Sequence, residues 1–568
     1  MSLGRSHIVL AEALQSLKAV TDVSKSAVVE SGDLDGEHRR QLVEAGFLEM
    51  IMRGWYAVSK PGARRRVETM WGSVYWDFVA QYLRKRFQNE YWLDPVASLR
   101  IHAENLKVPE QLVVCVSTGV NAKVELPNNT SLYIYNTTKP TSKTAIIEKG
   151  DLRMLSPETA IANLPVAAWA EDATDAAAVL GSIRGSSTLL RAILEDGKVV
   201  KAGAVAGALR QLGRGTDADA ILFSLKEGKH NVREIAPFEK TIDTKFDTRR
   251  PPKAAATRIT LMWERMRSSV LSHFTQEPKR INDIDGYLRD IDDRYVSDAY
   301  NSLSIEGYQV SAELIEKVKA GSWQPEIDAS DFDTQNALAA RGYWLAFNEV
   351  KADVGRILQN EPAGPLLWDR HQEWFKAMFQ PFVDANIRKQ FELVGYRNSP
   401  VYLFGSGHVP YSPDAVLDGM EALFECIDKE DDPRVKAVLA PFLFTYIHPF
   451  MDGNGRSARF LMNCLLAEGG YPWTVIPYER RDEYMACLEA ASSKEDIGPL
   501  AAFVAELVAA PPPPRPSTSA YPARKGPLPS ADNAPGVVVA SERHKGESGI
   551  QREEILVNML HLPSFPRA

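Results

Sequence analysis

The chain contains the stretch His448-Pro449-Phe450-Met451-Asp452-Gly453-Asn454-Gly455-Arg456-Ser457-Ala458-Arg459, which combines an imidazole, a carboxylate, a Gly-Asn-Gly turn and two arginines. Apolar residues recur at helical spacing on both sides of it, over residues 433–447 and 456–468. The stretch is therefore predicted to be a loop between two helices that leads into the N-terminus of the second helix.

This loop has the chemistry of a polyphosphate site. Glycines allow a tight turn and close approach of a ligand, and the first N–H groups of a helix favour an anion. Arg456 and Arg459 share one face of the first helical turn, an unfavourable position for two cations unless an anion lies between them. Asp452 suggests Mg²⁺ bound together with phosphates, and His448 is suited to accept a proton near neutral pH.

The stretch resembles the His-Pro-Phe-x-Asp-Gly-Asn-Gly-Arg-x-x-Arg motif of Fic-domain proteins at every signature position. The resemblance implies an all-α Fic domain that transfers AMP from ATP to a Ser, Thr or Tyr hydroxyl of a target protein and releases pyrophosphate. His448 would be the base, and Asp452 would bind Mg²⁺. The ATP phosphates would be bound by Gly453, Asn454, Gly455, Arg456 and Arg459.

Two further residues bear on the substrate. The family resemblance places adenosine contacts on the helix after residues 470–477, where Tyr484 is the best candidate. A related branch that phosphorylates its targets has a basic residue at the position of Gly455, so the glycine favours AMP transfer. UMP transfer remains an alternative.

A second motif, Ser302-Leu303-Ser304-Ile305-Glu306-Gly307, resembles the inhibitory pattern Ser/Thr-x-x-x-Glu-Gly/Asn of many Fic proteins. Ser302 and Glu306 are four residues apart and would share one face of a helix near 296–307. In the family this glutamate pairs with the second motif arginine, here Arg459, and keeps it from the γ-phosphate. The resemblance thus implies a chain that carries its own inhibitor.

The segment at residues 397–407 interrupts the helical pattern and places Val401, Tyr402 and Leu403 between Pro400 and Gly405. In Fic proteins this position is the flap, a β-hairpin whose edge pairs with an extended segment of the target protein. Edge pairing uses backbone donors and acceptors, so it presents a hydroxyl side chain with little demand on sequence.

The composition is that of a globular protein of several domains. The chain has 568 residues, which suggests three or four units of about 150 residues. Its net charge of −8 does not by itself favour binding to nucleic acid. The four cysteines lack metal spacing, residues 8–18 contain Glu12 and Lys18 and are not a signal peptide, and no long apolar run spans a membrane. We therefore expect a cytoplasmic protein with no membrane association.

The first sixty residues are predicted to form helices near 8–17, 24–29 and 38–44, followed by a β-hairpin over 47–58. This order is that of a winged helix-turn-helix, and the run from Leu42 to Val58 resembles the N-terminal domain of AbiE-type antitoxins. We therefore hypothesise that the first sixty residues bind DNA. The candidate phosphate contacts are Arg39, Arg40, Arg53 and Arg64 to Arg66.

The remaining chain divides by composition. Residues 61–245 are predicted to be an antitoxin-like mixed α/β and helical domain, with Ser156 as a helix N-cap and a linker near Arg249-Arg250-Pro251-Pro252. The Fic domain is expected over 257–509. Residues 510–568, which open with a run of prolines, are predicted to be a disordered tail.

Three functions remain compatible with these patterns. The first is a self-inhibited protein adenylyltransferase. The second is a DNA-binding regulator or antitoxin whose Fic domain senses nucleotide. The third is removal of AMP from a modified target, with Glu306 orienting a water molecule. The sequence leaves the oligomeric state open.

Overall fold

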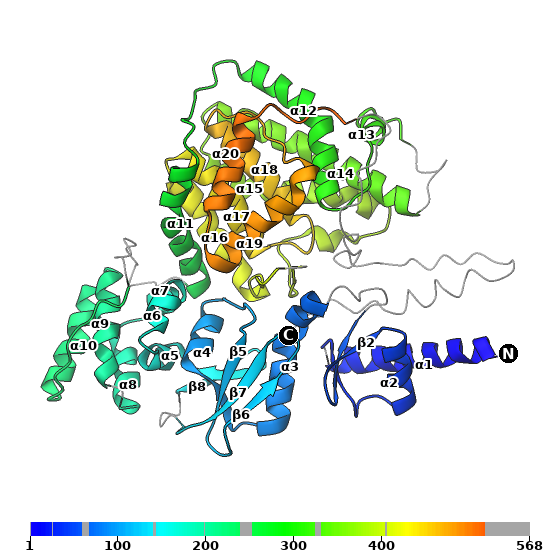
Figure 1. Cartoon of the computed structure of the whole chain (residues 1–568). Coiled ribbons are helices and arrows are strands. Elements are labelled where there is room, and N and C mark those ends of the chain that lie inside the picture. Colours follow the sequence, from blue (N-terminus) through cyan, green and yellow to red (C-terminus); the bar gives the residue numbers. More distant parts are fainter. Residues whose placement is uncertain are drawn as a thin grey trace. The chain divides into compact units, whose positions relative to one another are not determined.

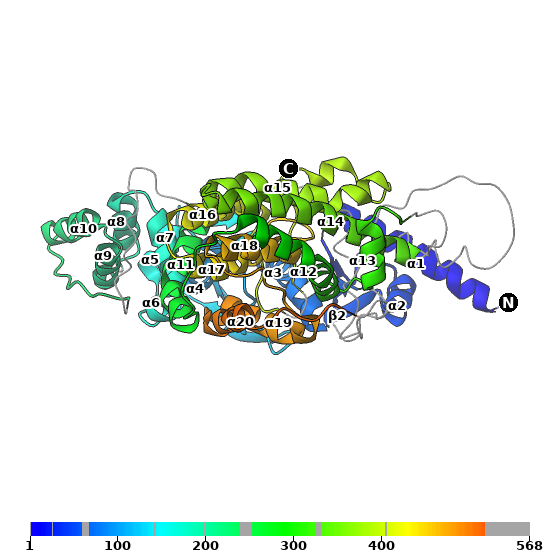
Figure 2. The same cartoon turned by 90° about the horizontal axis from the view of Figure 1, so that it is seen from above.

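The computed structural model describes residues 2–24, 26–59, 67–139, 144–197, 199–238, 253–323, 331–403 and 406–516. These residues belong to two compact units, and each is described by itself. The first holds the chain up to Leu261 together with Val401–Tyr411, and the second holds Met262–Pro400 and the chain from Ser412. Figures 1 and 2 show the elements of both units from two directions.

The first unit begins with a small three-stranded antiparallel sheet in the order β1-β3-β2. Its elements are α1 (Ser2–Ser24), β1 (Val28–Glu30), α2 (Gly36–Glu44), β2 (Leu48–Met52) and β3 (Trp55–Val58). The hairpin and the helix at 38–44 are confirmed. The helix predicted near 24–29 is wrong, because Val28 and Val29 pair with Ala57 and Tyr56 of β3 and β-branched residues fit such a pleated surface. The winged-helix assignment stays a prediction.

A six-stranded mixed sheet in the order β6-β7-β5-β4-β9-β8 follows. Its strands are β4 (Tyr91–Leu93), β5 (Gln111–Val116), β6 (Ala122–Glu125), β7 (Ser131–Asn136), β8 (Ile146–Lys149) and β9 (Leu152–Leu155). Alternation along β5 turns Val114 toward the cluster that contains Phe78 of α3 (Val67–Phe87), whereas Cys115 packs with Ala160 of α5 (Pro157–Asn163). Helices thus cover both faces. Ser156 caps α5 by accepting from the Thr159 N–H, as predicted.

An alanine-rich helical cluster completes the first unit. Its helices are α4 (Pro95–His102), α6 (Ala168–Glu171), α7 (Ala173–Ser182), α8 (Ser186–Glu195), the short η1 (Val199–Lys201), α9 (Ala202–Gln211) and α10 (Gly215–Glu227). The predicted linker near residues 249–252 lies outside the described residues. Helix α11 (Ala254–His273) follows, and its residues fall in both units.

In its described residues the second unit is helical, as predicted, with α18 packed against α12, α14, α15 and α17 (Figure 2). Its elements are α12 (Ile284–Ile305), α13 (Ala312–Lys319), α14 (Asp331–Leu358), α15 (Ala363–Asp384), η2 (Gln390–Leu393), α16 (Pro413–Lys429), α17 (Pro433–Ile447), α18 (Asn454–Glu468), η3 (Tyr478–Arg480), α19 (Arg481–Lys494) and α20 (Gly498–Ala509). This arrangement places the N-terminus of α18 beside the loop 448–453.

Two predicted features are only partly described. Val401, Tyr402 and Leu403 are not in a strand, and Phe404 and Gly405 lie outside the described residues, so the hairpin flap stays a prediction. Residues 517–568 also lie outside. Within the described start of the predicted tail, the carbonyl of Pro513 accepts a hydrogen bond from Ser297 Oγ, so this short part packs against α12.

None of the helices in the described ranges is long and apolar enough to span a lipid bilayer.

Gly342 on α14 offers a test of the helix packing. A Cβ at Gly342 would overlap the main chain of Met378 on α15, whereas a Cβ at Gly355 on the same helix would make an ordinary contact with Leu288. We expect Gly342→Ala to lower the free energy of unfolding by about 1–3 kcal/mol. The matched Gly355→Ala change should raise it by about 0.5–1 kcal/mol through helix propensity. Thermal unfolding of the full chain measures both, and equal midpoints for the two variants would contradict the close approach.

Candidate active site

The loop 448–453 begins where α17 ends, at His448, which is the C-cap of that helix and has a left-handed backbone (φ 58°, ψ 64°). Its Nδ1 lies 3.2 Å from the Thr445 carbonyl, so this nitrogen carries the proton and Nε2 is left as the basic atom. Burial and the charge of Arg397 lower the pKa of His448 to about 4, against the opposing effects of the Thr445 carbonyl, Glu306 and Asp452. The imidazole is therefore neutral at physiological pH.

Asn454 and Phe450 close the loop. The Phe450 N–H donates to Asn454 Oδ1 (2.9 Å), and Asn454 Nδ2 donates back to the Phe450 carbonyl (2.8 Å). The Phe450 ring stacks on Phe375 with centroids 4.1 Å apart, as expected of an anchor in the core. Because its side chain is used in this way, Asn454 has only its main chain to offer a phosphate.

Helix α18 starts without a side-chain cap. Gly453, its N-cap, has φ 80°, and a Cβ there would meet the ring of Phe379, so a side chain is excluded. The first N–H groups of a helix have no partner within the helix. The Gly453 N–H already donates to Asp452 Oδ1 (2.6 Å), so the N–H groups of Asn454 and Gly455 are the ones suited to an anion. The phosphate-binding roles of the three residues stay a prediction.

Arg456 is fully buried, and only part of its guanidinium is bonded. Its Nη2 donates to Asp452 Oδ1 (2.9 Å), whereas Nε and Nη1 have no hydrogen-bond partner among the described residues. The ring centroids of Tyr308 and Phe379 lie 5.3 Å and 5.0 Å from the guanidinium carbon of Arg456. Buried donors without a partner are costly, so this geometry favours an anionic ligand.

Asp452 is bound by two arginines. Arg388, which follows α15, donates from Nη2 to Asp452 Oδ2 (2.8 Å), and its guanidinium lies 4.1 Å from the centroid of Phe379. Burial acts to raise the pKa of Asp452, but Arg456 and Arg388 outweigh it and hold the pKa below its usual range. Sequence analysis missed Arg388, because no spacing relates it to the motif.

Asp452 is the residue of the motif that could hold Mg²⁺. No group of three or more His, Cys, Asp or Glu side chains that could hold a metal occurs in the part of the chain described here. Asp452 is ionised and is the one motif carboxylate. Mg²⁺ is commonly bound by one or two carboxylates together with substrate phosphates, so the site fits an ion that arrives with a nucleotide.

The structure brings the second predicted motif against Arg459. Arg459 Nη2 donates to Glu306 Oε1 (2.7 Å) and to the Ser302 carbonyl (3.0 Å), and its Nε donates to Ser302 Oγ (2.8 Å). The predicted inhibitory helix is longer than expected, since α12 begins at Ile284, and Glu306 is its C-cap. Burial acts to lower the pKa of Arg459, but Glu306 outweighs it, so the pKa lies above the ordinary value.

Tyr484, the predicted adenosine contact, is buried on α19, and its ring stacks on Phe503 with centroids 5.8 Å apart. Burial raises the pKa of Tyr484, while the nearby charge of Arg459 opposes this shift. The hydroxyl therefore lies in the field of the Arg459–Glu306 pair, and an adenosine contact stays a prediction.

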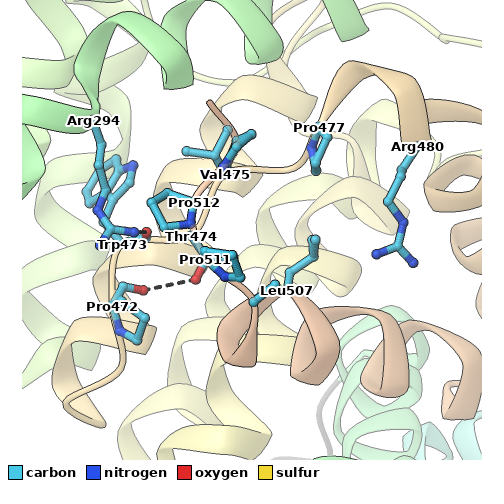
Figure 3. A pocket seen from close by; sticks show the side chains of 12 residues that line it. Arg294, Pro472, Trp473, Thr474, Val475, Pro477, Arg480, Leu507, Pro511 and Pro512 are labelled. Carbon is cyan, nitrogen blue, oxygen red and sulfur yellow. Dashed lines mark hydrogen bonds between the residues drawn. The ribbon is translucent and has the colours of Figure 1, made fainter. Parts of the chain in front are cut away.

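A separate cavity of about 160 Å³ lies elsewhere in the second unit. It is lined by Arg294, residues 472–475, Pro477, Arg480, Leu507, Ala510 and Pro511–Pro513 (Figure 3). None of the residues 448–459 lines it. The cavity is therefore a gap beneath the proline segment and not the predicted phosphate site.

The arginines proposed for DNA contact are partly engaged in the first unit. Arg39 donates to the Ser31 carbonyl and lies over the ring of Tyr56, and Arg40 pairs with Glu44. Arg53 is exposed, and Arg64 to Arg66 lie outside the described residues. DNA binding stays a prediction.

Residues 367–466 match the profile of the Fic/DOC family. The chain contains a Fic domain. Curated relatives of this segment are named Protein adenylyltransferase Fic, and those of Drosophila grimshawi and Drosophila mojavensis are 37% and 36% identical over 115 residues. Each alignment covers 20% of this chain but only 23% and 22% of the relatives, so the similarity is confined to less than a quarter of their length.

Two solved structures are also similar. Fic-1 from C. elegans has a TM-score of 0.33 at 17% identity, covering 59% of this chain and 84% of that chain. A Fic domain containing signaling protein from Bacteroides thetaiotaomicron has a TM-score of 0.30 at 20% identity, covering 44% of this chain and 92% of that chain.

The contact between α12 and α18 can be tested at Gly455. A Cβ at this helical position would collide with Glu306 Oε1 and lie 3.1 Å from Arg459 Nη1. We expect Gly455→Ala to lower the free energy of unfolding by about 1–3 kcal/mol in the wild-type chain. In a Glu306→Gly background the same change should be neutral or stabilising by up to about 1 kcal/mol, because the obstacle is gone and alanine favours the helix.

Denaturant unfolding of the four proteins gives the coupling between the two positions. Equal costs of Gly455→Ala in both backgrounds would contradict the placement of Glu306 over the start of α18.

Proposed function

We propose that the Fic domain of this chain transfers AMP from ATP to a Ser, Thr or Tyr hydroxyl of a protein target, and that Glu306 holds it inactive at rest. The observation that carries the proposal is the buried guanidinium of Arg456, which has two unpartnered donors in the described structure and lies in the first turn of α18, just after the loop that begins at the neutral His448. A base next to a site that requires an anion is the arrangement that nucleotidyl transfer needs. The names of the curated relatives support the same reaction.

In this proposal the phosphates of ATP lie over the N-terminus of α18, against Arg456 and Arg459. His448 Nε2 accepts the proton of the target hydroxyl while its oxygen attacks the α-phosphorus. The bond to the β-phosphate oxygen breaks, AMP remains on the target, and pyrophosphate leaves. Mg²⁺ held by Asp452 would neutralise charge on the phosphates. Positioning and charge stabilisation supply most of the rate.

The proposed inhibition follows from the contacts that the Arg459 guanidinium makes. In the structure its guanidinium donates to Glu306 and twice to Ser302. An arginine bonded in this way is not available to the outermost phosphate of ATP. Hydrogen bonds to charged groups contribute about 1.5–3 kcal/mol each, so their loss should change a rate about ten- to a hundredfold.

The target partner remains a proposal drawn from the family resemblance. An extended protein segment would pair with the chain near Val401, Tyr402 and Leu403 by main-chain hydrogen bonds. Binding of DNA through the first unit is compatible with AMP transfer and would serve recruitment or regulation.

The first test of this proposal is labelling by α-³²P-ATP with Mg²⁺. We expect weak labelling of protein by the wild-type chain, labelling about ten- to a hundredfold stronger by Glu306→Gly, and none by Glu306→Gly with His448→Ala. Glu313→Gln, which removes an exposed carboxylate on α13, is the matched control and should behave as wild type. Equal labelling by all variants would contradict both the base and the inhibitor.

The same proteins distinguish removal of AMP. Release of AMP from a target modified beforehand, by wild type but not by Glu306→Gln, would assign the reverse role to Glu306. Absence of such release, with strong forward labelling by Glu306→Gly, supports transfer alone.

The lowered pKa of His448 predicts how the rate of AMP transfer depends on pH. A general base acts only when unprotonated, and the pKa of His448 is lowered to about 4 by burial and then by Arg397. We expect kcat/KM of Glu306→Gly to be level from about pH 8 to about pH 5 and to fall about tenfold per unit below the pKa. A decline that already begins near the ordinary histidine value of 6.5 would contradict the neutral resting imidazole.

A further inference from the structure

His448 has a backbone that non-glycine residues rarely adopt. Its φ of 58° is left-handed, at the point where α17 ends and the motif loop begins. Such a conformation persists only where the surroundings hold it in place. The direction of the imidazole depends on it, because φ and ψ of His448 set where Cβ points.

One side chain outside the motif bonds the peptide groups on either side of His448. Arg397 donates from Nε to the His448 carbonyl (2.7 Å) and from Nη2 to the Ile447 carbonyl (3.4 Å). Its own N–H donates to the Pro449 carbonyl (2.9 Å). The guanidinium is buried, and its Nη1 donates to the Ser399 carbonyl (2.9 Å). Three successive carbonyls at the strained residue are thus bound by a single arginine.

We propose that Arg397 is the positioning residue for His448: it holds the left-handed turn that aims the imidazole. The inference rests on the proposed role of His448 as base. Arg397 is not assigned a contact with substrate.

Arginine is suited to this task. The last carbonyls of a helix lack partners within the helix and carry partial negative charge, which a cation satisfies. The planar fork of Arg397 reaches two of them at once, whereas a lysine offers a single point of charge. Burial and then the charge of Arg397 disfavour protonation of His448, whereas the Thr445 carbonyl, Glu306 and Asp452 favour it. In a chain with Glu306→Gly, removal of Arg397 leaves burial opposed by the Thr445 carbonyl and Asp452 among these described groups.

Arg214 provides a matched control in the first unit. It is also buried, and its Nη1 donates to the carbonyls of Leu180 and Ile183 (2.9 Å each) at the end of α7. The same substitutions at Arg214 remove a buried arginine from helix-terminal carbonyls without altering the surroundings of His448. A general effect of lost stability would therefore appear in both series.

The experiment uses the full chain with Glu306→Gly, so that turnover is measurable. We expect Arg397→Gln to lower kcat about a hundredfold while KM for ATP stays within about threefold, because misplacement of the base leaves the phosphate contacts intact. The pH below which kcat/KM falls should rise by about one unit. In Arg397→Lys this pH should stay unchanged while kcat falls about tenfold. In the Arg214 variants both this pH and kcat should stay unchanged.

A second measurement is independent of activity. Hydrogen exchange at the imidazole C2, read by mass spectrometry on the peptide that carries His448, follows the protonation of that one histidine. Its midpoint should rise in Arg397→Gln and stay in Arg397→Lys and Arg214→Gln. If no variant transfers AMP, the proposed function fails, yet this midpoint still tests Arg397. An unchanged midpoint in Arg397→Gln, or an unchanged kcat in Arg397→Lys, overturns the inference.

Discussion

Two buried guanidinium groups on the first turn of α18 set the requirement that the rest of this site meets. The side chains of Arg456 and Arg459 are 0% and 5% exposed, and a charge removed from water must find a partner. Asp452 meets this need in part for Arg456, and Ser302 with Glu306 meets it for Arg459. Because Ser302 and Glu306 lie at the end of α12, their hydrogen bonds with Arg459 also hold α12 against α18.

The loop before α18 is held by contacts that do no chemistry themselves. The Asn454 side chain is hydrogen-bonded to the Phe450 backbone, and the Phe450 ring is stacked in the core. Arg397 binds the carbonyls around His448. These contacts leave the imidazole and the arginines with little freedom, so the site is formed before any ligand arrives. Such preorganisation is what makes fixed charges effective in a buried site.

The sequence predicted those features that depend on spacing, and missed those that depend on the fold. The motif loop follows from the apolar periodicity on both sides of it, the pair of Ser302 with Glu306 follows from a resemblance to a short family pattern, and the structure brings them together. Arg388 and Arg397 lie in irregular segments far from the motif in sequence, so no periodicity points to them. The error near Val28 and Val29 has a similar cause, since their pairing with β3 is decided by residues about thirty positions away.

The two arginines differ in how firmly they are held, and this difference bears on the proposed inhibition. Arg456 is bonded to Asp452 in the loop directly before its own helix, and the rings of Tyr308 and Phe379 lie beside its guanidinium. Glu306 instead contributes one oxygen from the C-cap of α12, and its side chain is 29% exposed. Rotation of that one side chain releases the charge of Arg459, while Ser302 still fixes the position of the arginine. Helix termini are also where local opening costs least. The contact that we propose to be inhibitory is thus placed where it can be broken without dismantling the proposed phosphate site.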